Sequence, residues 1–175
     1  MIIRQEKGAD HTKVFDLIKN AFQTEEQSGH REQFLVKRLR HSNSFIPELS
    51  LVAEIDKKIV SFILLTKIKI VNNHKEEFPS LALAHLAVLR SHQKKGIGEH
   101  LIRSAHKKAT ELEFGSVILL GHENYYPRFG YQMTSKYSII LPFDVPDENC
   151  MLIELAEGAL KNINEIVEYP QEFYL

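Results

Sequence analysis

A buried strand, a glycine-containing turn and a helix follow one another between residues 81 and 112. Residues 81–89 are short and almost continuously apolar, which is typical of a strand covered on both faces. From Ile97 to Leu112 the apolar side chains recur at helical spacing. Between them lies the run Gln93-Lys94-Lys95-Gly96-Ile97-Gly98. This order restricts the chain to folds in which a helix follows a central strand directly in the sequence.

The turn between this strand and this helix has the chemistry of an anion site. Two glycines allow the backbone to turn tightly and to approach a ligand closely. The first N–H groups of the helix lack partners within it, and with the helix dipole they suit phosphate oxygens. Between residues 94 and 108 five basic residues stand against one acid. An ordinary turn with solvated lysines remains the alternative, because the run matches neither a Walker loop nor the dinucleotide-binding glycine pattern.

The remaining segments predict a mixed α/β domain that uses the whole chain, residues 1–175. A short edge strand is expected at the N-terminus, and Asp10 is expected to cap a first helix. A second helix follows a capping-box pattern at residues 24–27. The expected strands lie at residues 1–4, 50–55, 59–70, 81–89, 117–120, 131–141 and 150–155, with a helical turn at 125–129.

Composition excludes several classes of protein. The 175 residues are 43% hydrophobic and 26% charged, as in an ordinary globular domain. The single cysteine, Cys150, excludes a disulfide framework and is expected to pack as a small apolar side chain. No signal peptide or membrane span is visible, so we expect a cytoplasmic protein without membrane contact. The net charge of −1 argues against a nucleic-acid partner, and the nine histidines show no metal-binding spacing, so no metal is expected.

Two motifs in the same order carry a resemblance to a known family. The segment from Leu86 to Gly98 resembles the acetyl-CoA-binding motif of the GNAT family of N-acetyltransferases, Q/R-x-x-G-x-G/A after an apolar strand. The segment from Leu119 to Tyr131 resembles the family's later strand, short helix and Tyr-x-x-x-Gly-aromatic pattern. Its Tyr-Tyr-x-Arg-Phe-Gly form is similar to a subgroup of predicted bacterial N-acetyltransferases. That subgroup also tends to carry Ser-Leu-Val-Ala-Glu, here residues 50–54, and a run like residues 141–146.

The resemblance implies a fold and a cofactor site. The fold is a mixed, mostly antiparallel twisted sheet of about six or seven strands with about four helices and splayed central strands. Acetyl-CoA is the implied co-substrate, with its pantetheine arm on the central strand and its pyrophosphate on the loop. The residues implied to bind it are Leu86, Ala87, Val88, Gln93, Lys94, Lys95, Gly96, Ile97, Gly98, Glu99, Asn124 and Tyr126.

The resemblance also implies direct acetyl transfer to a primary amine, which requires an acid and a base. Tyr126 is implied to protonate the departing CoA thiolate, with Tyr125 as the alternative. The base is open. His85 is one candidate, because an imidazole transfers protons near neutral pH, and a buried core histidine is the competing reading. Weaker candidates, for which a solvated surface role is the default, are Glu25, Glu26, His30, Glu54, His122 and Glu123.

A second function stays open from the sequence. A module that binds acyl-CoA without catalysis would keep the loop and would need neither acid nor base. The acceptor is a small-molecule or peptide amine whose identity the sequence does not indicate. A homodimer is an open expectation, and the aromatic end, residues 169–174, is expected to cover the core or to join such a contact.

Overall fold

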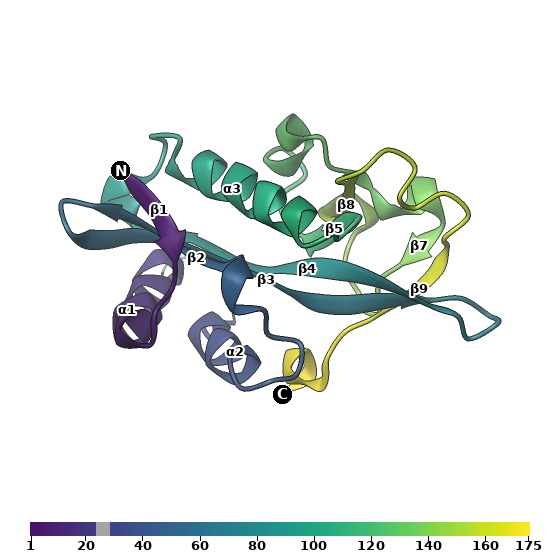
Figure 1. Ribbon diagram of the computed structural model, residues 1–175, viewed down its shortest axis with the longest axis horizontal. Coiled ribbons are helices and arrows are strands. Elements are labelled where there is room, and N and C mark those ends of the chain that lie inside the picture. Colours follow the sequence, from purple (N-terminus) through teal and green to yellow (C-terminus); the bar gives the residue numbers. More distant parts are fainter. Residues whose placement is uncertain (24–28) are drawn as a thin grey trace. The chain divides into compact units, whose positions relative to one another are not determined.

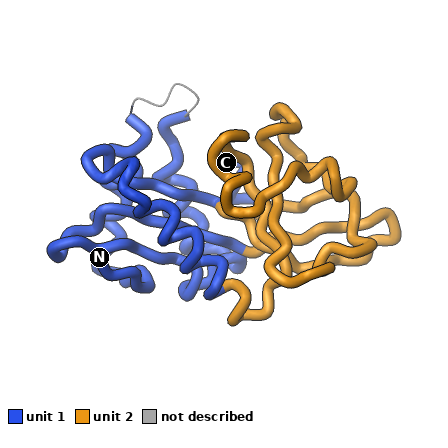
Figure 2. Tube along the Cα trace, turned by 90° about the horizontal axis from the view of Figure 1, so that it is seen from above, with its two compact units in different colours: residues 1–66, 84–108, 171–175 blue, residues 67–83, 109–170 orange. Residues whose placement is uncertain are grey.

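The computed structural model describes residues 1–23 and 29–175. The chain forms two compact units, which Figure 2 colours separately. Unit 1 contains residues 1–66, 84–108 and 171–175, and unit 2 contains residues 67–83 and 109–170. The predicted capping box at residues 24–27 lies outside the described residues.

Unit 1 is built from helices on both faces of a group of strands. Its strands are β1 (Ile2–Gln5), β2 (Ser50–Ile55), the first part of β3 (Lys58–Val71) and the last part of β4 (Glu77–Val88). Helices α1 (His11–Phe22) and α2 (Glu32–Leu39) lie side by side on one face, and α3 (Ile97–Glu111) lies on the other (Figure 1). Apolar side chains of α1 and α2 pack onto β2 and β3, where Val52, Phe62 and Leu64 are fully buried. The helical periodicity of α1 and α2 therefore has its expected cause, burial of one face.

Unit 2 contains the later strands, which are mostly short. They are β5 (Ser116–Leu120), β6 (Gln132–Met133), β7 (Ile139–Ile140), β8 (Cys150–Glu154) and β9 (Glu165–Glu168). Antiparallel β8 pairs with all of β5, from Ser116↔Glu154 to Leu120↔Cys150. β9 pairs antiparallel with the end of β3 and parallel with β7.

The hydrogen-bonded order of the strands is β1-β2-β3-β4-β5-β8-β6, with β9 on β3 and β7 on β9. Most pairs are antiparallel, as predicted, and β4 with β5 is a parallel pair at the centre. This pair has its register at Leu81↔Val117 and Ala82↔Ile118, while β4 continues to Val88. The mixed α/β fold with diverging central strands is therefore confirmed. The described residues form nine strands and three α-helices, against the six or seven strands and four helices expected.

Three local predictions were wrong. The expected strand at 131–141 is broken into β6 and β7 by the 3-10 helix η5 (Thr134–Tyr137), which ends at Ser138 with a left-handed φ of 54°. Strand β9 was missed, because Ile166 and Val167 between two glutamates are too short an apolar run to stand out. Asp10 stands at the start of α1, but within the described chain its carboxylate accepts from Arg4 and from the Lys7 N–H instead of capping that helix.

Candidate active site

The loop between β4 and α3 is fixed by its own hydrogen bonds. Leu89 N–H donates to Val60 O at 2.9 Å, which ends β4 against β3. The 3-10 helix η3 (Arg90–His92) follows, and His92 N–H donates to Leu89 O at 2.8 Å. The Gln93 side chain then reaches back to Val88 O at 3.2 Å. The exposed loop therefore leaves the strand and enters the helix along one defined path.

Two residues of this loop have left-handed backbone conformations. Lys94 has a φ of 58° and Gly96 a φ of 76°, a region that residues other than glycine adopt at a cost. No described heavy atom beyond its chain neighbours lies within 4 Å of the position that a Cβ atom would take at Gly96. Glycine is thus needed there for its backbone conformation, and the space beside it is open to a ligand.

The charged side chains of the loop are arranged around its backbone. Lys95 Nζ donates to Ser91 O at 2.8 Å, and Lys94 is exposed. Glu99, in the first turn of α3, forms an ion pair with Arg103 at 2.9 Å. Ile97 and Gly98 are buried at the start of α3, where the first N–H groups of the helix face the loop. The loop and the start of α3, on which the predicted anion site depends, both lie within unit 1.

The end of β4 carries the three residues predicted to bind the pantetheine arm. Leu86 and Val88 are half-buried, and Ala87 is buried. The carbonyl of Ala87 accepts a hydrogen bond from Ser61 Oγ on β3 at 2.7 Å. A side chain therefore holds this part of β4 in addition to the strand ladder. Ser61 escaped the sequence analysis, since a lone serine in an apolar strand gives no signal by itself.

His85 lies on β4 just before these residues and is 6% exposed. Its ring packs against Phe22 of α1, with the ring centroids 4.9 Å apart. Burial lowers the pKa of His85 to about 4, and the nearby charge of Glu32 opposes that shift. His85 is therefore neutral at pH 7, and its Nε2 atom is buried without a hydrogen-bond partner among the described residues. His85 is thus a buried histidine, and its catalytic role stays a prediction.

Tyr126 lies in unit 2, at the start of the 3-10 helix η4 (Tyr126–Phe129). It is 9% exposed, and its ring makes edge contacts with Tyr125 and Tyr131 at centroid distances of 5.0 and 5.6 Å. Burial, with a smaller contribution from Tyr125, raises the pKa of Tyr126 well above its ordinary value. Its phenol is therefore protonated at neutral pH. Tyr125 is half-buried under the guanidinium of Arg128, which lies 4.2 Å from its ring centroid.

Gly121 and Asn149 contact this part of unit 2 and were not predicted as site residues. A Cβ atom at Gly121 would lie 2.3 Å from Tyr126 Cε2, so only glycine leaves room for the ring. Asn149 Nδ2 donates to Gly121 O at 3.0 Å. A glycine five residues before Tyr126 is the one signal in the sequence that points to this contact.

The weaker candidates occupy the following places. Glu25 and Glu26 lie outside the described residues, while His30 is exposed. Glu54 pairs with Arg4 at 3.0 Å. His122, Glu123 and Asn124 are exposed, and Asn124 Nδ2 donates to Glu123 Oε1 at 3.1 Å.

Three further expectations concern Cys150, metals and membranes. Cys150 is buried, as expected, and burial raises the pKa of its thiol. The described residues contain no group of three or more His, Cys, Asp or Glu side chains that could hold a metal ion. None of the described helices has the length and apolar character needed to cross a membrane.

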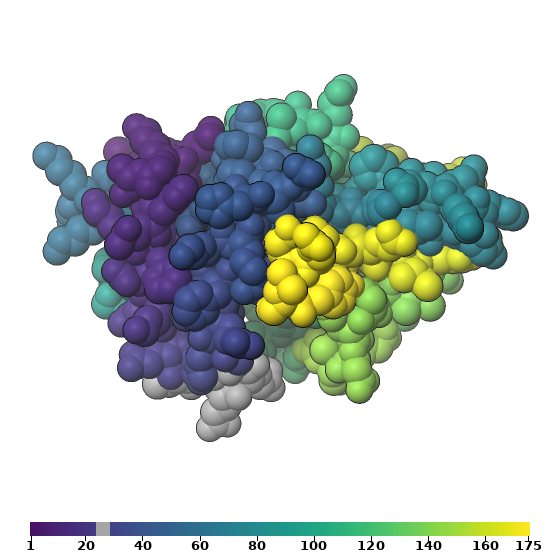
Figure 3. All heavy atoms as spheres, turned by 90° about the horizontal axis from the view of Figure 1, so that it is seen from below, coloured from purple at the N-terminus to yellow at the C-terminus, as the bar shows by residue number. Residues whose placement is uncertain are grey.

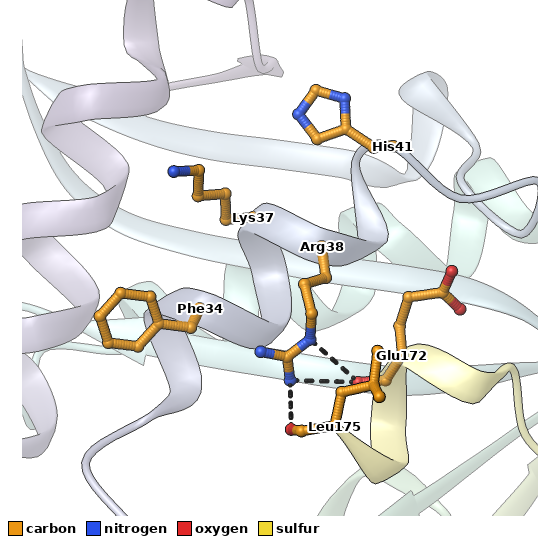
Figure 4. A pocket seen from close by; sticks show the side chains of 6 residues that line it. All are labelled: Phe34, Lys37, Arg38, His41, Glu172 and Leu175. Atoms are coloured by element: carbon orange, nitrogen blue, oxygen red, sulfur yellow. Dashed lines mark hydrogen bonds between the residues drawn. The ribbon is translucent and has the colours of Figure 1, made fainter.

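A separate groove of about 490 Å3 lies in unit 1 between α2 and the C-terminal residues (Figure 4). Arg38 closes one side of it by donating to the carbonyl oxygens of Glu172 and Leu175. The last residues lie over α2 in Figure 3, and Phe173 packs against the core of unit 1. Phe173 therefore covers part of this core, in line with one of the two sequence-based alternatives, while Tyr174 is exposed. The groove contains none of the predicted site residues.

Comparison with known proteins identifies the family of this chain. A family model described as an acetyltransferase (GNAT) domain matches residues 2–134. The chain belongs to the GNAT family of acetyltransferases. The prediction of an acyltransferase is thereby confirmed at the level of the family.

Two relatives and two solved structures extend this result. The uncharacterized N-acetyltransferase YjhQ of Escherichia coli is 32% identical over 120 residues, which are 68% of this chain and 66% of YjhQ, just under two thirds. The uncharacterized N-acetyltransferase YhbS of E. coli is 23% identical over 99% of this chain and 98% of its own. The YhbS crystal structure in complex with CoA has a TM-score of 0.89, with 22% identity, over 99% of this chain and 92% of that one. A GNAT family acetyltransferase from Brucella melitensis in complex with acetyl-CoA has a TM-score of 0.80, with 24% identity, over 98% and 97%.

Proposed function

We propose that this protein transfers the acetyl group of acetyl-CoA directly to a primary amine. The observation that carries this proposal is the loop from Gln93 to Gly98, with a left-handed Gly96 and an open space beside it. The relatives YhbS and the Brucella melitensis protein bind CoA and acetyl-CoA in structures of the same fold. Residues 1–175 act as one domain in this proposal, since β3, β4 and α3 each run through both units.

The cofactor site that we propose uses backbone groups more than side chains. The N–H groups at the start of α3 and the loop from Gln93 to Gly98 would bind the pyrophosphate, with charge added by Lys94 and Lys95. The residues on β4, Leu86 to Val88, would pair with the pantetheine arm as a strand would. Glu99 and Asn124 also belong to the residues that we propose bind acetyl-CoA. Glu99 acts through its ion pair with Arg103, which holds a positive charge beside the loop.

Tyr126 is the proposed acid of the reaction. Acetyl-CoA supplies an activated thioester, whose acetyl group forms a C–N bond with the amine while the C–S bond breaks. The phenol of Tyr126, protonated at neutral pH, donates its proton to the departing sulfur. Its ring makes edge contacts with Tyr125 and Tyr131, which restrict its orientation. The role comes from the resemblance to the family's Tyr-x-x-x-Gly-aromatic segment, in which Tyr126 stands four residues before Gly130.

His85 is the proposed base. Its imidazole is neutral at pH 7 and has an accepting nitrogen, which are the two properties that deprotonation of an amine requires. With a pKa of about 4 it holds a proton weakly by itself. The negative charge of Glu32 raises that pKa and therefore favours the protonated form during transfer.

The test of this function is a measurement of CoA release with four kinds of amine. These are a polyamine, a free amino acid, an aminoglycoside and a peptide with a free amino terminus. Tyr126→Phe is expected to slow turnover by about 100-fold, within the range for loss of one general acid, and to spare acetyl-CoA affinity. Tyr137→Phe, on the half-buried tyrosine of η5, is the matched control. Unchanged turnover in Tyr126→Phe would remove the acid role.

A non-catalytic acyl-CoA-binding module is the alternative function. It is favoured by the low pKa of His85, because a weak base suits binding better than proton transfer. Such a module would bind acetyl-CoA in calorimetry and release no CoA with any amine of the panel. The same two measurements therefore separate the enzyme from the module. A homodimer stays an expectation of the family resemblance, which light scattering would measure.

A further inference from the structure

The antiparallel pair of β5 and β8 ends in an unusual way just before Tyr126. Its last registered pair is Leu120↔Cys150, and one step further Gly121 N–H still donates to Asn149 O at 3.0 Å. In a regular ladder Asn149 N–H would return this bond to Gly121 O. Instead it donates to Pro146 O at 3.0 Å, within the 3-10 helix η6 (Asp147–Asn149). The Asn149 N–H therefore takes no part in the ladder, although the Asn149 carbonyl still accepts from Gly121.

The side chain of Asn149 supplies the missing bond. Its Nδ2 atom donates to Gly121 O at 3.0 Å and also lies 3.3 Å from Glu123 Oε2. Gly121 is thus held through both its N–H and its C=O, as in the middle of a sheet, although the partner strand has already turned away. An amide on a short side chain is needed here, since an aspartate would place an acceptor against the carbonyl.

Gly121 in turn sets the space for the ring of Tyr126. A Cβ atom on Gly121 would lie 2.3 Å from Tyr126 Cε2 and 2.7 Å from Cδ2. Normal contacts between carbon atoms are about 3.5–4.0 Å, so the backbone of Gly121 lies directly against one edge of the ring. Tyr125 and Tyr131 contact the ring elsewhere. A shift of Gly121 would therefore move the ring or open a gap beside it.

We propose that Gly121 and Asn149 are positioning residues that fix the hydroxyl of Tyr126 for proton transfer. Gly121 acts by contact with the ring, and Asn149 acts through Gly121. The inference rests on the proposed function, in which Tyr126 is the proton donor. It also gives a role to the run at residues 141–146, which leads into η6 and brings Asn149 to the end of β5.

Two variants test the proposal, one by adding bulk beside the ring and the other by removing a hydrogen bond. Gly121→Ala adds a methyl group where the ring now lies. Because the φ of Gly121 is not left-handed, its effect is steric. Asn149→Ala removes the bond to Gly121 O and adds no bulk.

With the fastest amine of the panel, we expect kcat to fall about 100-fold in Gly121→Ala, as for a reacting group misplaced by about 1 Å. In Asn149→Ala we expect a fall of about 10-fold, the effect of one lost hydrogen bond. Acetyl-CoA affinity should change less than about 3-fold in both.

The controls match each change. Gly8→Ala adds a methyl group to a glycine with open space around it. Ser135→Ala removes a bond to Asp147 of η6, at 2.7 Å, and leaves Gly121 untouched. Both should keep the kcat of the unchanged protein. In a Tyr126→Phe background Gly121→Ala should cause no further loss of kcat, because the hydroxyl it misplaces is already absent.

An NMR measurement separates this proposal from the proposed function. Tyrosine ring signals are recorded with labelled tyrosine, and the signal that disappears in Tyr126→Phe identifies Tyr126. That signal should shift in Gly121→Ala and Asn149→Ala and stay in place in both controls. An unmoved signal, or equal losses of kcat with and without the Tyr126 hydroxyl, would overturn the positioning role. Unchanged turnover in Tyr126→Phe alone, with the signal shifted in both variants, would instead overturn the acid role in the proposed function.

Discussion

Substitution of Asp10 by asparagine tests the ionic contacts that attach the start of α1 to β1. Arg4 donates two hydrogen bonds to the Asp10 carboxylate, Nη1 to Oδ2 at 2.7 Å and Nη2 to Oδ1 at 3.1 Å. The Lys7 N–H adds a third at 2.8 Å. Arg4, followed by the Lys7 N–H, lowers the pKa of Asp10 from 3.8 to about 2 against the opposing effect of burial. The helix held in this way carries Phe22, which packs on His85.

The size of the effect follows from the shift in pKa. A tenfold change in acid dissociation is worth about 1.4 kcal/mol, so a fall from 3.8 to about 2 corresponds to about 2 kcal/mol. The Arg4 side chain is 26% exposed, and solvent screening reduces this value. We therefore expect Asp10→Asn to lower the free energy of unfolding by about 1–2 kcal/mol at pH 7.

The sign of the pH dependence is fixed by the direction of the shift. The folded protein holds the Asp10 proton less tightly than the unfolded chain, so the stabilisation is complete above about pH 4. It disappears as the pH falls from 4 towards 2. Urea unfolding at pH 7, 5, 4 and 3 should therefore show a difference between the two proteins that is constant at first and then shrinks. Asp16→Asn, an exposed carboxylate on the same helix, is the control. A difference that persists unchanged to pH 3, or none at pH 7, would refute the reasoning.

Two further predictions concern unit 1. Gly96→Ala should weaken acetyl-CoA binding by about tenfold, because a φ of 76° costs a residue with a Cβ atom about 1–2 kcal/mol. Calorimetry measures this affinity. Unchanged affinity with an intact fold would show that the loop is not part of the site. His85→Gln should make stability less dependent on pH: the pKa of His85 is about 4 in the folded protein against 6.5 unfolded, so the unchanged protein loses up to about 3 kcal/mol between pH 7 and pH 4. Urea unfolding across that range checks this, and parallel curves for the two proteins would contradict the burial of a neutral imidazole.

The parts of the fold with a strong period were predictable from the sequence. The apolar run before Gly96 and the helical spacing after it located β4 and α3 to within a few residues, because burial imposes those periods. Strand β9 was not predictable in the same way, since its four residues depend on pairing with β3 and β7, which are distant in sequence.

The candidate site divides along the same line. The loop residues could be predicted as a candidate site because their chemistry is local: glycines, a helix start and nearby lysines. The roles of Ser61 and Asn149 depend on contacts with partners 26 and 28 residues away, whereas Gly121 contacts Tyr126 only five residues along the chain. Asp10 illustrates the limit for polar side chains. Its sequence position suits a helix cap, but its carboxylate accepts hydrogen bonds from the Arg4 guanidinium on β1 instead.

The amide of Asn149 also has a consequence for how such a protein can change over evolutionary time. Because one side chain closes the ladder at Gly121, the segment before it does not need to continue the strand. Insertions or deletions between residues 141 and 148 can alter the surface without moving Tyr126, provided that an amide returns to the same carbonyl. A chain built in this way can vary this part of its surface while the position of the Tyr126 ring stays constant.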